Sequence, residues 1–161
     1  MRQLVTTGLL WFSAVGCGLL AGVYFAFSAF VMTSLTRIAR AAGISAMNAI
    51  NVVIVKSLFM PIFIGTTLTA VVLTGLAILS WNEAGSIVML ADGIIYVIGM
   101  FVVTAAFNVP LNDALAAVDP SSAEGAVVWS RYLRDWTLWN HVRTVASVAA
   151  CAFFIACIAT R

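Results

Sequence analysis

The sequence predicts an all-α membrane protein: a bundle of four transmembrane helices in which helices three and four extend beyond the membrane on one side. Its composition supports this class, because 63% of the 161 residues are hydrophobic and only 9% are charged. A soluble domain carries about 25% charged residues, so these few charges cannot cover a soluble surface. The apolar runs are continuous, which favours helices over alternating strands. The composition excludes a soluble enzyme, a disordered chain and a nucleic-acid-binding protein.

Four apolar stretches are long enough to cross a bilayer, whose hydrocarbon core needs about 20 helical residues. We expect them to form a single integral membrane domain over residues 1–161, and the turn between spans two and three is short enough to make these spans antiparallel. The four spans cover residues of about 4–32, 61–80, 86–107 and 142–160.

The first connection and the glycines give further expectations. Gly43 predicts the end of an extended first helix, because glycine often ends helices, and residues 44–56 read as a short amphipathic helix. Gly18 and Gly22 lie four residues apart in the first span and predict close helix packing. We interpret the three cysteines as small buried residues, since they lie in apolar stretches without a Cys-x-x-Cys motif.

The second half of the chain predicts helices that continue outside the membrane. Pro110 lacks a backbone donor and should kink the helix that follows the third span. Ser121 and Glu124 have the spacing of a capping box. The fourth helix is therefore expected to begin near Ser122 and to enter the membrane near His141.

An even number of spans places both termini on one side of the membrane and loops one and three on the other. Lys and Arg are more frequent on the loop side, so the positive-inside rule predicts that loops one and three are cytoplasmic and both termini are outside. The cations on the loop side are Arg37, Arg40, Lys56, Arg131, Arg134 and Arg143.

His141 is the only histidine and the first candidate for chemistry. A histidine can act as a base near neutral pH, and Asn140 and Arg143 lie beside it in the sequence. The alternative is a polar residue at the membrane interface. Asn108 and Asn112 are four residues apart and share one helix face; they indicate either a site or a hydrogen-bonded clamp between helices.

An aromatic stripe along the fourth helix ends in a cation. Its spacings of three and four residues place it on one helix face. It predicts either the wall of a pocket for a flat aromatic compound, with Asn140 and His141 at the edge, or simple helix packing and interface anchoring. The stripe consists of Trp129, Tyr132, Trp136, Trp139 and Arg143.

Asp92 is an acidic residue within the third span, and such a residue is a functional candidate by default. The alternative is a position at the interface near the start of the span. Metal sites receive little support, because a structural zinc site needs about four Cys or His ligands. No cofactor is predicted, although a haem held by His141 alone or with a methionine stays open.

Several motifs resemble the anthrone oxygenase family of small four-helix membrane proteins, which has many bacterial members of unknown function. The motifs are Asn108-Val109-Pro110-Leu111-Asn112, then Trp129-x-x-Tyr132-x-x-x-Trp136, then Trp139-Asn140-His141-x-Arg143. The first span, loop one and the second span show weaker likeness, so the resemblance covers nearly the whole chain. Thr33 and Met60 depart from the family pattern, which has a proline after the methionine at 32 and an asparagine before Pro61.

The resemblance implies oxidation of an anthrone to an anthraquinone by O2 without a metal or flavin. His141 would be the base, and Arg143 with Asn108, Asn112 or Asn140 would hold the developing oxyanion. Trp136, Trp139 and Tyr132, with Trp129 behind them, would stack on the rings of the substrate. The implied partners are a lipophilic aromatic molecule and membrane lipid, in a bacterial inner membrane, and a homo-oligomer is left open.

Two other functions stay open from the sequence. The chain could be a non-enzymatic membrane subunit or a lipid- or quinone-binding scaffold, in which the polar residues are a structural clamp. A weaker alternative is a haem-binding membrane protein that uses His141.

Overall fold

The computed structural model describes residues 1–83 and 85–160, apart from the side chain of residue 2. The described part is helical throughout, without strands, and confirms the all-α class. Four of its helices are long and apolar enough to cross a membrane, so the chain is an integral membrane protein. These helices cover Gln3–Leu35, Phe59–Leu79, Ser86–Ala116 and Ala123–Ala159.

The first long helix consists of α1 (Arg2–Ala26), the π-helical turn η1 (Phe27–Val31) and α2 (Met32–Leu35). It ends at Leu35 and not at Gly43, so that prediction was wrong. Gly43 lies inside α3 (Arg40–Ile54), where a Cβ atom would come within 3.0 Å of the Leu35 carbonyl and 3.1 Å of the Trp129 ring. Close packing, and not a helix end, accounts for this glycine.

The second and third spans form an antiparallel pair, as the short turn predicted. α4 (Phe59–Leu79) is followed by α5 (Ser86–Tyr96), and Gly85 between them has a φ of +86°, which favours glycine. The third long helix then continues through two π-helical turns, η2 (Val97–Val102) and η3 (Thr104–Asn108), into α6 (Val109–Ala116). Pro110 lies in the first turn of α6, so the irregular winding lies just before the proline.

The fourth helix is a single long element, α7 (Ala123–Ala159). Its N-cap is Ser122, whose Oγ accepts a hydrogen bond of 2.9 Å from the Gly125 N–H. The predicted start is therefore confirmed, but the capping box on Ser121 was wrong. The backbone N–H of Ser121 instead donates to Asp119 Oδ1 in the preceding turn, at 2.8 Å.

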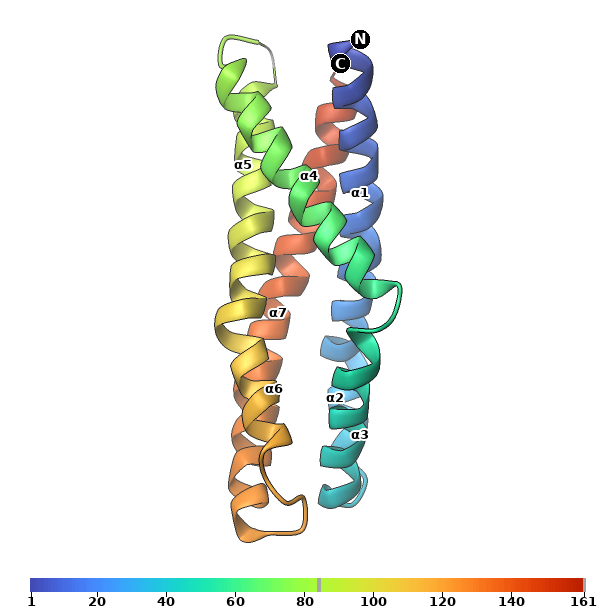
Figure 1. Cartoon of the computed structure of the whole chain (residues 1–161), viewed down its shortest axis with the longest axis vertical. Coiled ribbons are helices and arrows are strands. Elements are labelled where there is room, and N and C mark those ends of the chain that lie inside the picture. Colours follow the sequence, from blue (N-terminus) through green and yellow to red (C-terminus); the bar gives the residue numbers. More distant parts are fainter. Residues whose placement is uncertain (84, 161) are drawn as a thin grey trace.

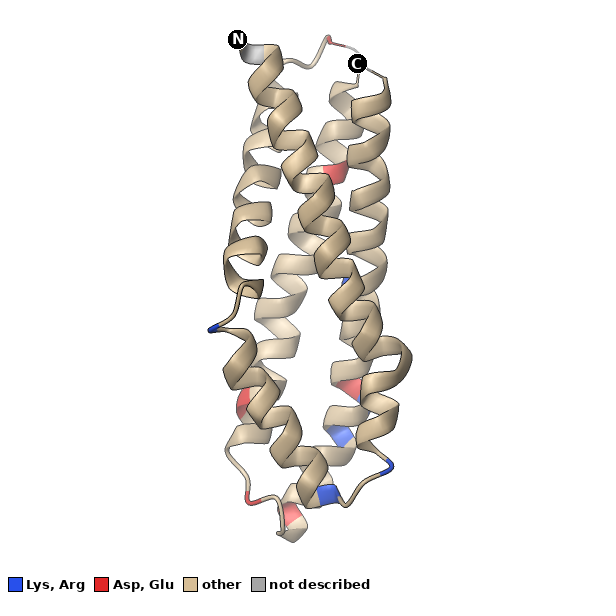
Figure 2. Cartoon of the chain, turned by 90° about the vertical axis from the view of Figure 1, so that its right-hand side faces the viewer, with Lys and Arg blue, Asp and Glu red and all other residues tan. Residues whose placement is uncertain are grey.

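The long helices run side by side, and both termini lie at one end of the bundle (Figure 1). The opposite end consists of α3, α6 and the first half of α7, and we call it the crown. The third and fourth helices have 31 and 37 residues, more than the about 20 that a bilayer core requires, and therefore continue into the crown. Figure 2 shows most of the charged residues towards this end.

Small residues set how closely the helices approach. Gly18 and Gly22 are exposed. A Cβ at Gly22 would meet no atom within 4 Å, and one at Gly18 would make only an ordinary contact with Cys151 Sγ of α7 at 3.6 Å, so neither position requires the predicted close helix packing within the chain. Gly16 is the close-packed position, because a Cβ there would overlap the Thr66 side chain of α4. Two of the three cysteines, Cys17 and Cys157, are buried as expected, and Cys151 is half-buried.

Candidate functional site

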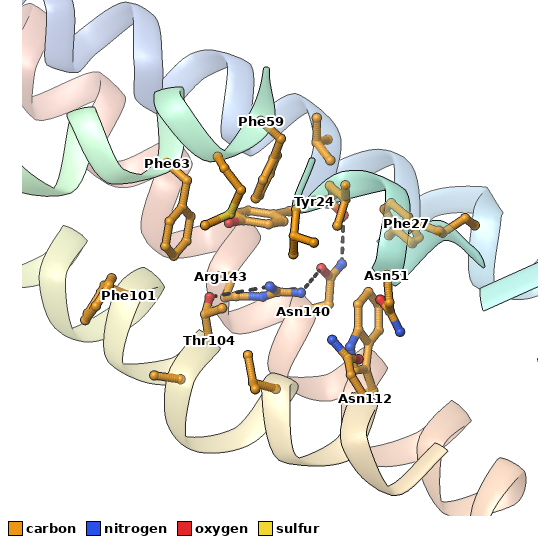
Figure 3. A pocket seen from close by; sticks show the side chains of 18 of the residues that line it. Tyr24, Phe27, Asn51, Phe59, Phe63, Phe101, Thr104, Asn112, Asn140 and Arg143 are labelled. Carbon is orange, nitrogen blue, oxygen red and sulfur yellow. Dashed lines mark hydrogen bonds between the residues drawn. The ribbon is translucent and has the colours of Figure 1, made fainter. Parts of the chain in front are cut away.

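A cavity of about 320 Å³ lies where the crown meets the membrane-spanning part of the bundle (Figure 3). Its walls come from α1, η1, α3, α4, α7 and the irregular third helix, so all four long helices and α3 contribute. The walls are mostly apolar, and cavities of this size bind small molecules. The polar and aromatic residues that line it are Tyr24, Phe27, Asn51, Phe59, Phe63, Phe101, Thr104, Asn112, Trp136, Asn140 and Arg143.

Arg143 is the central charged group of this cavity. It is only 6% exposed, and its Nη2 donates to Asn140 Oδ1 at 2.8 Å. Its guanidinium carbon lies 4.4 Å from the ring centroid of Tyr24 and 5.2 Å from that of Trp136. Within the described part of the chain, no carboxylate forms an ion pair with it. A buried cation without a counter-charge costs several kcal/mol, so the cavity favours an anionic or electron-rich ligand.

Three N–H donors at the cavity lack acceptors among the described residues. They are Arg143 Nε, Asn51 Nδ2 and Trp136 Nε1, and all three are buried. An unpaired buried donor is expensive, so such groups usually meet a ligand or water. These donors come from α3 and α7 and line the same cavity, an arrangement suited to an oxygen atom that carries negative charge.

Asn140 fixes the position of Arg143. Its Nδ2 donates to the Tyr24 carbonyl and to Ser28 Oγ, both at 2.8 Å, while its Oδ1 accepts from Arg143. The first helix changes from α to π winding at Phe27, next to this contact. π-Helical turns shift the backbone bonding pattern and often occur at functional sites. The amide of Asn140 thus holds the guanidinium of Arg143 in a fixed position relative to Tyr24 and Ser28.

His141 lies outside the cavity. Its side chain is exposed on the outer surface of the bundle, and a hydrogen bond of 2.8 Å joins its Nδ1 to Ser28 Oγ. Since Ser28 also accepts from Asn140, the histidine is connected to Arg143 through two intermediate side chains. The candidate base and the candidate oxyanion holder are therefore linked but not adjacent.

The two asparagines of the third helix occupy different surroundings. Asn112 lines the cavity, and its Oδ1 accepts a hydrogen bond of 2.7 Å from the Tyr132 hydroxyl. Asn108 is buried away from the cavity lining, and its Nδ2 donates to the Trp136 carbonyl at 3.2 Å. Asn108 thus joins the third helix to α7, as in the clamp that the sequence left open.

The aromatic stripe divides between two sides of α7. Trp129, Tyr132 and Trp136 stack in series, with centroid distances of 5.8 and 5.5 Å, and only Trp136 lines the cavity. Trp139 stacks on Phe107 at 3.7 Å, beside a separate pocket of about 290 Å³. Since residues turn by about 100° along a helix, Trp139 lies about 60° away from Trp136.

Several residues of the cavity were not singled out from the sequence as site residues. Tyr24 comes from the first span, Asn51 from α3 and Thr104 from η3. One signal was available, because Tyr24 and Ser28 are four residues apart and put two polar groups on one face of a lipid-spanning helix. No group of three or more His, Cys, Asp or Glu that could hold a metal occurs in the described ranges.

The fold and the cavity define an integral membrane protein with a buried cationic pocket between aromatic walls. A sequence model of the anthrone oxygenase family matches residues 51–153, more than half of the chain. The chain therefore belongs to the anthrone oxygenase family, as its motifs predicted. The chain has no significant match among curated proteins or among solved structures.

Proposed function

We propose that this protein is a cofactor-independent oxygenase of the membrane that oxidises an anthrone-like or other phenolic polycyclic aromatic with O2. The observation that carries this proposal is the set of unpaired donors, Arg143 Nε, Asn51 Nδ2 and Trp136 Nε1, within an aromatic-lined cavity. An anthrone that loses a proton becomes a delocalised anion with charge on its oxygen. The donor set supplies a fixed partner for that oxygen.

The walls of the cavity suit the rest of such a substrate. The rings would lie between Trp136 on α7 and the phenylalanines of α4 and η2, since flat aromatic groups stack favourably on aromatic side chains. The carbon that reacts would face away from Arg143, towards the apolar side where O2 dissolves readily. A tricyclic compound partitions into lipid, so a cavity at membrane depth gives it direct access.

The reaction balances without a further oxidant. The substrate CH2 group loses one proton, and the resulting carbanion transfers an electron to O2 and forms a C–O bond, which gives a peroxide. The O–O bond then breaks as the second C–H proton leaves, so that a ketone and one water molecule form. Each turnover consumes one O2 per quinone, and this O2 is the oxidant that is reduced.

His141 remains the proposed base of this reaction, acting through its neighbours. A proton released in the cavity would reach the Ser28 hydroxyl through water, and Ser28 would give its own proton to His141. The Asn140 amide donates to Ser28 and holds it in place, and carries no proton itself. Asn108 and Asn112 keep the third helix in place against α7, and Asn112 adds an amide at the cavity. Tyr132 and Trp129 support Trp136 by stacking, whereas Trp139 would contact substrate only on the outer side of α7.

The protein would then lie in a bacterial inner membrane, with loops one and three in the cytoplasm and both termini outside, in keeping with the positive-inside rule. Its partners would be a lipophilic aromatic substrate and membrane lipid. The proposed chemistry uses no metal, flavin or haem.

Turnover of anthrone by protein in lipid nanodiscs tests the function. Quinone absorbance and O2 consumption should rise together, one O2 per quinone, at a rate well above that of empty nanodiscs. Arg143→Gln should lower kcat/KM by about 10²–10³-fold, the loss typical of removing an oxyanion donor. The control is Arg134→Gln, an exposed arginine of the same helix that pairs with Asp135. Anthraquinone binding without turnover would instead support the non-enzymatic scaffold.

A further inference from the structure

Asp92 of α5 is a buried acid that the proposed chemistry leaves unused. Its exposed fraction is 0%, and neither carboxyl oxygen has a hydrogen-bond partner among the described residues. It therefore lies inside the bundle and not on its outer surface. Burying a polar group without a hydrogen bond costs about 2–7 kcal/mol, and acids inside membrane bundles usually serve proton or ion transfer.

The unpaired groups extend from Asp92 towards the cavity. One helical turn from Asp92 on α5 lies Tyr96, and one turn from Arg143 on α7 lies Ser147. Their hydroxyls are buried and lack hydrogen-bond partners in the described ranges, as does Thr66 of α4. Three helices thus contribute unpaired polar atoms to the interior of the bundle between Asp92 and the cavity.

Shared burial connects these groups. Cys17 and Tyr24 of α1 and Tyr96 of α5 pack in one cluster of buried side chains. The Tyr24 ring centroid also lies 4.4 Å from the guanidinium carbon of Arg143 in the cavity. We call the groups from Arg143 to Asp92 the polar column.

The polar column ends at Asp92. Closer to the termini, the buried apolar side chains include Leu10 of α1, Met89 of α5 and Phe154 of α7. Buried serines there are already hydrogen-bonded, Ser13 to Thr69 and Ser86 to the Ser80 carbonyl. The column is therefore open at the cavity and closed towards the other side of the membrane. This arrangement does not form a path across the bilayer, but it can exchange a proton with the cavity.

We propose that Asp92 is a neutral, proton-exchanging carboxyl group connected to the Arg143 cavity by water held along the polar column. The titratable groups that face it are the thiols of Cys17 and Cys151. No cation among the described residues pairs with it, so the neutral form avoids an isolated buried charge. Water molecules bridge buried polar groups of this kind, typically with about three hydrogen bonds each.

The role of this group rests on the proposed function. When O2 adds to the substrate carbanion, the Asp92 carboxyl gives its proton through the water to the peroxide oxygen. The second proton, which leaves the carbon as the O–O bond breaks, restores the neutral carboxyl. The first proton, held on His141, joins the departing hydroxide to give water. The proton is conserved, and no electron passes through the column.

Infrared spectroscopy of the protein in nanodiscs tests the site without any turnover. Carboxyl-labelled aspartate should reveal the C=O band of a neutral carboxyl that shifts within minutes of transfer to D2O. The band should disappear in Asp92→Asn and persist in Asp113→Asn, which changes an exposed aspartate in the same manner. No such band, or a band that stays unshifted for hours, would overturn the proposal. If Asp92→Asn does not fold, the infrared spectra of the labelled wild-type protein and of labelled Asp113→Asn are compared. The same shifting band in both would support the proposal, and its absence from both would overturn it.

Activity then tests the role. With the infrared result positive, Asp92→Asn should lower quinone formation by roughly 10²-fold, as expected for loss of an acid catalyst, and should leave the affinity for anthraquinone unchanged. If the Asp92→Asn variant forms quinone at the wild-type rate, Asp92 has no role in the reaction. If the wild-type protein has no oxygenase activity, the proposed function fails while the infrared result still decides whether Asp92 exchanges protons.

Discussion

Replacing Asn140 by aspartate tests whether the uncompensated charge of Arg143 is what binds an anionic ligand. The two side chains have nearly the same shape, so the change would put a carboxylate oxygen where the amide oxygen now lies, 2.8 Å from Arg143 Nη2. Two unit charges about 4 Å apart attract each other by about 4 kcal/mol at an effective dielectric constant of 20. The guanidinium would then be neutralised from within the protein.

The expected magnitude follows from this attraction. A ligand anion that competes with the new carboxylate loses up to about 4 kcal/mol, which corresponds to about a 10³-fold weaker Kd. Folding should survive, because the new ion pair offsets the loss of the donor to the Tyr24 carbonyl and to Ser28. That loss costs about 1–3 kcal/mol for each unsatisfied group. Affinity should therefore fall far more than stability.

The assay is a titration with an ionised hydroxyanthraquinone, which does not react further and quenches the fluorescence of Trp136. Thermal unfolding in the same detergent gives the stability. Asn82→Asp is the control, because it makes the same chemical change at an exposed position in the turn between α4 and α5. A folded Asn140→Asp protein whose Kd changes by less than about tenfold would refute the reasoning, since the Coulomb attraction would then not act on the ligand.

Two further predictions concern the packing that supports the cavity. Asn108→Ala removes a buried donor to a carbonyl of α7, so unfolding free energy should fall by about 1–3 kcal/mol; unchanged thermal stability would rule out the clamp. Gly16→Ala should destabilise by about 1–3 kcal/mol, because its Cβ overlaps a side chain of α4. Gly22→Ala, which has no neighbour within 4 Å, serves as its control, and equal effects of the two alanines on thermal unfolding would contradict the packing model.

Helix positions could be predicted from the sequence to within a few residues. The roles of the residues at the predicted helix ends could not. Ser121 and Ser122 offer the same side chain, and only the backbone path after the turn makes Ser122 the N-cap. Gly43 resembles a helix end in the sequence, yet its role is to let α3 approach the Trp129 ring. A glycine has the same local signature in both roles, so the neighbour across the interface decides between them.

Some of the residues that the sequence singled out line the same cavity. The polar and aromatic residues of the fourth helix do gather near the crown, and Arg143, Asn140, Trp136 and Asn112 line one cavity. His141, one residue after Asn140, points to the outside, because each step along a helix turns the side chain by about 100°.

The sequence by itself determined the class of this protein, since apolar composition and span length depend only on the residues and on the thickness of the bilayer. It also predicted that most of the charged residues gather at one end of the bundle, as Figure 2 shows. Only the tertiary structure decided which polar groups share a cavity. Convergence depends on the rotation and approach of each helix, which close contacts such as Gly16 against Thr66 set. Spacing along one helix defines a face, but it does not reveal which face of another helix lies opposite.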